Sequence, residues 1–148
     1  MSALAGRPFA RMNGLGNEIV VLDLRGTKLA VSAAEARAIH AAPRLAYDQL
    51  MVIEDARSEG TQAFVRIFNN DGTESGACGN GTRCVAYIMT RAGTPPRFFI
   101  ETQAGRLECV REDEWTYMVD MGEPRLQWRD IPLSQEQSDT RAIALDYE

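Results

Sequence analysis

Cys78 and its neighbours are the residue types best suited to chemistry in this chain. They lie in RIFNNDGTESGACGNGTRCVAYIM, which runs from Arg66 to Met89. Cys78 follows a polar turn, and Gly79, Asn80 and Gly81 directly after it open an expected helix. A helix N-terminus carries unpaired N–H donors and a partial positive charge. Such a position binds carboxylates or phosphates and favours the thiolate form of a cysteine, so we interpret Cys78 as a reactive thiol.

The alternative is that Cys78 is a small buried residue and that its glycines serve only a tight turn, since free cysteines are commonly buried. The helix start and the polar run before it favour the reactive thiol. Cys84 lies six residues on, about 240° around a helix, and is expected to pack in the core. Cys109 lies in the middle of an expected strand, and we predict a core position for it too. His40 lies in an Ala-rich helix, where a packing or surface role is expected.

Composition excludes several classes of function. The chain has 148 residues, a length sufficient for one globular domain with a core. Of its residues, 45% are apolar and 25% are charged, which is ordinary for a globular protein. Three cysteines, an odd number, argue against a disulfide scaffold, and three Cys with one His in no ligand-like spacing argue against structural zinc. Lys28, the only lysine, lies in a turn-like segment, which argues against a pyridoxal phosphate Schiff base. We therefore expect no cofactor and no metal.

The net charge and the hydropathy of the chain limit the kinds of partner that we expect for it. The net charge is −5 and no Lys/Arg stripe is present, so nucleic acid is not expected as a partner. No apolar run approaches the roughly 18 residues of a membrane span, and the N-terminus has no signal-like apolar stretch. We expect a cytoplasmic protein that does not enter the membrane.

The elements that must position Cys78 are short strands and two helices. Ser32 to Ala42 reads as a helix, because Ser32 and Glu35 form a capping-box pattern and Pro43 ends it. The second helix starts near Cys78–Gly79 and ends before Gly93. Many short strands with two separated helices predict an α+β domain. Strand patterns cover residues 9–12, 18–24, 49–55, 61–68, 97–102, 105–112 and 115–121.

Several segments together resemble the diaminopimelate epimerase family. NGLGNE, YDQLMVIE, RIFNNDGTES, ACGNGTRC and MGEP occur here in the same order as in that family. The resemblance covers nearly the whole chain from Phe9 onward. CGNGTRC preceded by FNNDGTE is a specific signal, whereas GLGN alone would be weak.

The resemblance implies a fold, an activity and a set of site residues. Mostly antiparallel strands would wrap around a central helix that starts near Cys78. The activity would be cofactor-independent interconversion of LL- and meso-2,6-diaminopimelate, in lysine and cell-wall precursor synthesis, by two cysteines acting as acid and base. Cys78 corresponds to one of these two. The substrate would be contacted by the side chains of Asn17, Gln49 and Asn69 and by backbone hydrogen bonds from Gly79 and Asn80.

The chain departs from the family's pattern in two ways. Family members usually show HGLGND, where this chain has Asn13 and Glu18 at the outer positions. The family also has a second domain, which supplies the other cysteine and is absent here. We expect residues 1–133 to form the N-terminal domain and 134–148 to be a linker or the start of that second domain. The C-terminal domain of the same enzyme is the expected partner, association as a homodimer is left open, and the chain alone is expected to fold but to be inactive.

Two other functions compete with this interpretation. One is a related two-cysteine amino-acid racemase, such as a proline racemase relative. Those proteins typically carry His after Cys-Gly, so Asn80 argues against this reading. The other is a non-catalytic single-domain module, and substrate turnover by the chain would separate it from an enzyme.

Overall fold

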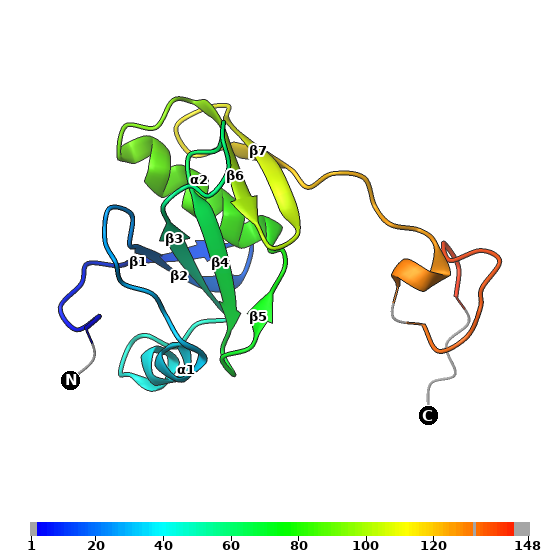
Figure 1. Ribbon diagram of the computed structural model, residues 1–148, viewed down its shortest axis with the longest axis horizontal. Helices are drawn as coiled ribbons and strands as arrows, with labels where there is room; N and C mark the ends of the chain where they lie inside the picture. The colour runs from blue at the N-terminus through cyan, green and yellow to red at the C-terminus, as the bar shows by residue number, and fades with distance from the viewer. Residues whose placement is uncertain (1–2, 132, 144–148) are drawn as a thin grey trace.

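A single curved sheet forms the body of the protein. The structure is a computed structural model that describes residues 3–131 and 133–143. Its sheet has eight strands in the order β1-β2-β3-β4-β6-β7-β8, with β5 paired to β4. The β2–β3 and β4–β6 pairs are parallel and the others antiparallel, so the sheet is mixed. The sheet curls into a half-barrel (Figure 1). The strands are β1 Ala10–Gly14, β2 Asn17–Asp23, β3 Gln49–Glu54, β4 Phe64–Asn69, β5 Glu74–Ser75, β6 Arg97–Thr102, β7 Gly105–Arg111 and β8 Tyr117–Asp120.

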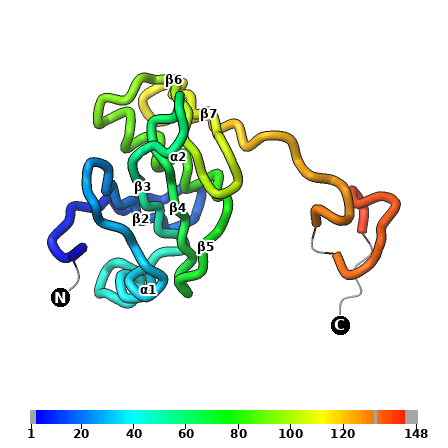
Figure 2. Tube along the Cα trace, viewed as in Figure 1, coloured from blue at the N-terminus to red at the C-terminus, as the bar shows by residue number. Residues whose placement is uncertain are grey.

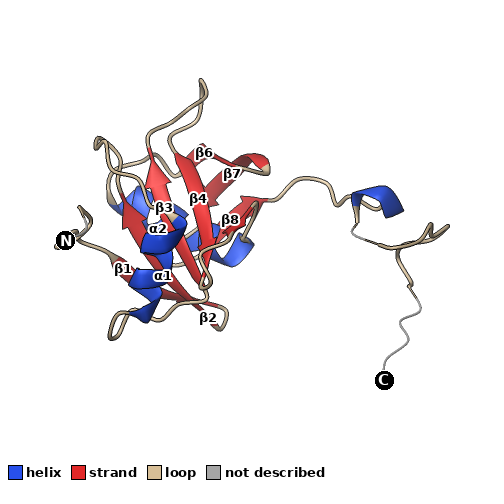
Figure 3. Ribbon diagram, turned by 60° about the horizontal axis from the view of Figure 1, so that its bottom comes forward, coloured by secondary structure: helices blue, strands red, loops and turns tan. Residues whose placement is uncertain are grey.

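Helix α2, Gly79–Arg91, packs against the concave face of the sheet. It contacts β1, β2 and β3 toward one end of the sheet and β7 and β8 at the other, so the curved sheet wraps around it (Figure 3). Val85, Ala86 and Met89 on α2 are fully buried among inward-facing strand residues. The expected α+β fold, with strands wrapped around a central helix that starts near Cys78, is confirmed.

Helix α1, Ala33–Ala41, covers part of the opposite face. The two faces divide β2 between them: Ile19 and Val21 belong to the core around α2, while Val20 and Leu22 belong to the core near α1. Strand β3 is divided in the same way. Both strands are covered on both sides, which explains why their sequences are continuous apolar runs rather than alternating ones.

The expected start of α1 is confirmed in detail. The Ser32 side chain accepts a hydrogen bond from the Glu35 backbone N–H, and the Glu35 carboxylate accepts one from the Ser32 backbone N–H. His40 has the packing role expected of it. Its Nδ1 accepts a hydrogen bond from the backbone N–H of Tyr47, 3.2 Å away, and the two rings lie edge to face.

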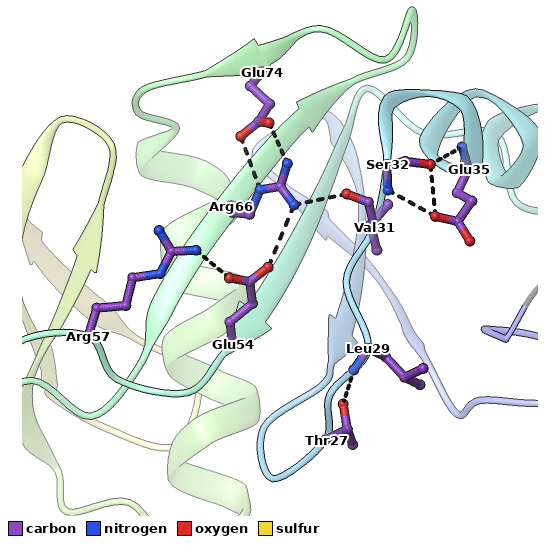
Figure 4. Close-up of polar contacts among 9 residues, drawn as sticks. All are labelled: Thr27, Leu29, Val31, Ser32, Glu35, Glu54, Arg57, Arg66 and Glu74. Carbon is purple, nitrogen blue, oxygen red and sulfur yellow. Dashed lines mark hydrogen bonds and ion pairs between the residues drawn. The ribbon is translucent and has the colours of Figure 1, made fainter.

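An ionic cluster on the α1 side ties β3, β4 and β5 together (Figure 4). The Arg66 guanidinium donates to Glu74 and to the Val31 carbonyl, and it lies 3.7 Å from Glu54. Glu54 also pairs with Arg57. The hydrogen bond from Arg66 lowers the pKa of the Glu74 carboxyl.

The predicted strands are all present, with differences at their ends and two additional short elements. Strand β1 extends to Gly14, because Leu15 and Gly16 both adopt positive φ and close a two-residue hairpin to β2. The β6–β7 hairpin turns at Gln103–Ala104, and Gly105, the first residue of β7, adopts a positive φ. Strand β5 and the 3₁₀ helix η1, Trp128–Asp130, were not predicted.

Residues that follow β8 leave the half-barrel and extend away from it (Figure 2). Strand β8, the last of the sheet, ends at Asp120. The described residues leave out 1–2, 132 and 144–148. These residues belong to the two predicted segments, 1–133 and 134–148.

Candidate active site

Cys78 is the N-cap residue of α2. Its Sγ accepts a hydrogen bond from the Gly81 backbone N–H at 3.3 Å, and its carbonyl accepts the Thr82 N–H at 2.8 Å. A Cβ at position 81 would lie 2.5 Å from the Met51 sulfur and 3.2 Å from the Cys78 sulfur. Glycine at position 81 therefore allows the helix start, the thiol and β3 to approach one another closely.

Side-chain amides connect the thiol to β2 and β3. The Cys78 Sγ lies 3.7 Å from Gln49 Oε1, within hydrogen-bonding distance for sulfur. Gln49 Oε1 also accepts from Asn17 Nδ2, and Asn17 Oδ1 accepts from Asn80 Nδ2, both at 3.2 Å. Four of the six predicted site residues are thus joined by consecutive hydrogen bonds.

The pairing of β2 with β3 explains how residues far apart in the sequence meet here. Ile19 is paired with Gln49 in the parallel β2–β3 register, so Asn17, at the start of β2, projects near the start of β3. Gly14 packs against Asn80, since a Cβ there would lie 3.2 Å from the Asn80 carbonyl oxygen. The β1–β2 hairpin and the first turn of α2 are therefore held in contact.

The remaining two predicted residues, Asn69 and Gly79, flank this group. Asn69 is paired with Gln49 across β3 and β4, but its side chain donates to Thr73 Oγ1 at 3.0 Å. Asn69 is thus a neighbour of the amide chain rather than a link in it. Gly79 is the first residue of α2, and the first turn contains no acidic residue. The positive end of the helix therefore has no carboxylate of its own beside Cys78.

Cys84 and Cys109 are core residues, as predicted. They are 5% and 0% exposed, and both belong to the cluster around α2. Burial raises the pKa of Cys84 to about 11 and that of Cys109 to about 12. Both thiols therefore stay protonated near neutral pH. Cys78, by contrast, is only partly buried.

The sequence interpretation missed Arg83 and Met51. The Arg83 Nη1 donates to Asn80 Oδ1 at 2.8 Å, three residues back on the same helix. The i, i+3 spacing on an expected helix was a signal that could have revealed this contact. Met51 lines the space beside Gly81, and only the packing of β3 against α2 reveals it.

The described part of the chain holds neither a metal-binding cluster nor a membrane-spanning helix. Over residues 3–131 and 133–143, no three His, Cys, Asp or Glu side chains come together as metal ligands. Over the same ranges, no helix is long and apolar enough to cross a membrane.

Comparison with known proteins places this arrangement in a family. The model of the family described as diaminopimelate epimerase matches residues 9–127, which include all six predicted site residues. The chain belongs to the diaminopimelate epimerase family. The resemblance seen in the sequence is therefore confirmed at the level of the family.

Curated diaminopimelate epimerases are similar over almost all of this chain. The protein of Rhodopseudomonas palustris strain BisB18 is 57% identical over 145 residues, which are 98% of this chain and 50% of that relative. The protein of Methylocella silvestris is 51% identical over 147 residues, 99% of this chain and 51% of the relative. The chain therefore spans about half the length of the curated relatives that it matches, corresponding to an N-terminal half.

Solved structures agree on the fold. A PhzF-family phenazine biosynthesis protein of Bacillus anthracis matches with a TM-score of 0.53 at 21% identity, over 75% of this chain and 36% of that protein. A PhzF-family protein of Enterococcus faecalis matches with a TM-score of 0.52 at 18% identity, over 73% and 39%. At these identities the likeness concerns the fold alone.

Proposed function

We propose that this chain supplies one half of a cofactor-independent epimerase site, with Cys78 as one of two acid/base cysteines. The observation that carries the proposal is the N-terminus of α2. There a partly buried thiol caps a helix whose first turn has no acidic residue. The substrate proposed from the relatives' name is diaminopimelate, interconverted between its LL and meso forms, in a cytoplasmic step of lysine synthesis.

The α2 terminus has two tasks in this mechanism. Backbone N–H groups of Gly79 and Asn80 would hold the α-carboxylate, as helix N-termini hold anions. Fixed donors at a carboxylate also stabilise the negative charge that develops when the α-proton leaves. Cys78 would then remove the proton from one face of the α-carbon or deliver one to it.

The amide side chains beside the thiol would orient the substrate. Asn17 and Gln49 lie within hydrogen-bonding distance of each other, and Gln49 reaches the Cys78 sulfur. Asn69 lies next to Gln49 in the sheet register. Together they offer polar groups to the amino and carboxylate groups of an amino acid held over Cys78.

Inversion needs a second acid/base group on the opposite face of the α-carbon. Cys84 and Cys109 cannot serve, because both are buried and protonated near neutral pH. We propose that a second domain, entered through residues 134–148, supplies the second cysteine. On this proposal the 148-residue chain folds alone but does not invert its substrate.

The test is solvent deuterium incorporation at the α-carbon of diaminopimelate, measured with the LL-to-meso ratio. The 148-residue chain should show no inversion, and a two-domain relative should show both exchange and inversion. Replacing the cysteine equivalent to Cys78 by Ser in that relative should lower kcat by about 10²- to 10⁴-fold, the usual contribution of one acid/base group. The matched control is Ser at the Cys84 position. Inversion by the 148-residue chain at the two-domain rate would refute the half-site, and near-normal turnover by the folded Ser variant would refute the role of Cys78.

A further inference from the structure

Among the side chains joined by hydrogen bonds beside Cys78, Arg83 is the one that can act only as a donor. A guanidinium has N–H donors and no acceptor, whereas a side-chain amide can present either its oxygen or its NH₂ group. Arg83 Nη1 lies 2.8 Å from the Asn80 side chain, so the atom that faces it must be Oδ1. The orientation of the Asn80 amide follows from this contact alone.

Each later link then has one consistent orientation. With Oδ1 on Arg83, Asn80 turns its Nδ2 to Asn17, which must accept through Oδ1. The Asn17 Nδ2 is left to donate to Gln49, which must accept through Oε1. The same Gln49 oxygen lies 3.7 Å from the Cys78 sulfur. An acceptor, and not a donor, therefore faces the thiol from β3.

The orientation matters because a thiol can donate a hydrogen bond and a thiolate can only accept one. The Gly81 backbone N–H stabilises the thiolate, and the Gln49 oxygen stabilises the thiol. Without Arg83, the reversed chain would satisfy the amides equally well and would turn the Gln49 NH₂ group toward the sulfur. That reversal would stabilise the thiolate from two sides.

We infer that Arg83 is a positioning residue that, through Asn80, Asn17 and Gln49, keeps the Gln49 carbonyl oxygen, and not its NH₂ group, against the Cys78 sulfur in the resting protein. Arg83 is exposed, so it acts from the outer surface of α2 without touching the sulfur. Its importance for epimerisation rests on the proposed function. The orientation of the amides does not, and it can be tested without substrate, so the two proposals can fail separately.

The first readout is the side-chain NH₂ resonances of Asn80, Asn17 and Gln49 in the reduced 148-residue chain, by ¹H–¹⁵N NMR. Arg83→Met should shift all three, including Gln49, which lies three links away from Arg83. Arg83→Lys, whose ammonium is also a pure donor, should restore them. Arg91→Met removes the same charge from an exposed position on the same helix and should move none. If Arg83→Met moved only Asn80, the proposed chain would be refuted.

The second readout is the alkylation rate of Cys78 by iodoacetamide at neutral pH in 1 M salt, where the Debye length is about 3 Å and the charge of Arg83 is screened. The positioning role predicts a rate several-fold higher in Arg83→Met than in the native protein, with Arg83→Lys and Arg91→Met at the native rate. A purely electrostatic role predicts an unchanged rate at this salt concentration and a lower rate at low salt, since losing a cation disfavours the thiolate. An unchanged or lower rate in folded Arg83→Met would overturn the inference.

Discussion

The two helices of this protein begin in different ways. At α1, the Ser32 and Glu35 side chains close a reciprocal capping box, which places a carboxylate in the first turn. At α2, the Cys78 sulfur takes one N–H, and the first turn has two glycines and no acid. The first arrangement uses the helix terminus for stability. The second leaves the positive end of the helix without a carboxylate of its own and places a thiol beside it.

The largest expected contrast is in thiol reactivity. In the native chain, iodoacetamide should label Cys78 at least about 100-fold faster than Cys84 or Cys109 near neutral pH. Raising the pKa of Cys84 from 9.0 to about 11 alone lowers its thiolate fraction by that factor. The burial of Cys84 and Cys109 also limits access of the reagent, which adds to the difference in labelling rate. Peptide mapping after partial labelling measures it, and preferential labelling of Cys84 or Cys109 would show that the α2 terminus is not the reactive end.

Close packing at the start of α2 gives the next largest effect. Gly81→Ala should lower the free energy of unfolding by about 1–3 kcal/mol, because its Cβ would overlap the Met51 sulfur. Gly79→Ala is the matched control. Its Cβ would meet Met121 at an ordinary 3.7 Å, so a change within about 0.5 kcal/mol is expected. Urea unfolding measures both, and equal costs would mean that position 81 has no special packing requirement.

Removing the cap of α1 should affect stability and leave the thiol unchanged. Ser32→Ala should cost about 1 kcal/mol of unfolding free energy, because the Glu35 backbone N–H loses its partner. Ser32→Asp should retain most of this stability, since Asp is also a good N-cap. The Cys78 alkylation rate should match the native rate in both variants. A changed rate would mean that the two helix termini are coupled.

The ionic cluster beside α1 should give the smallest effect. Glu74→Gln should cost at most about 1 kcal/mol at pH 7, because the Arg66–Glu74 pair is partly exposed to solvent. The pKa of Glu74 is lowered in the folded state, so its contribution is present above about pH 4.5 and is lost as the pH falls through the folded value. Urea unfolding of both proteins from pH 7 to pH 3 should therefore show the difference shrinking. A difference that grew toward low pH would contradict the assigned role.

Local patterns in the sequence were sufficient to predict most of the helices and strands. The Ser32–Glu35 spacing predicted the start of α1, and glycine after Cys78 predicted the start of α2, because capping depends on neighbours within one helical turn. Strand β5 was missed, since two residues carry no periodic pattern. The extension of β1 to Gly14 was missed as well, because it depends on the positive φ of Leu15 in the hairpin turn.

The candidate site was only partly determined by the sequence. The sequence by itself determined that Cys78 stands at a helix start. Its resemblance to a known family pointed to five further site residues, which are Asn17, Gln49, Asn69, Gly79 and Asn80. Only the tertiary structure decided that Asn17, Gln49 and Asn80 join in one chain of hydrogen bonds, while Asn69 turns to Thr73. It also brought Arg83 into that chain. The physical reason is that capping is settled within one helical turn, whereas the contacts among β2, β3 and α2 depend on strand register and helix docking between residues up to 63 positions apart.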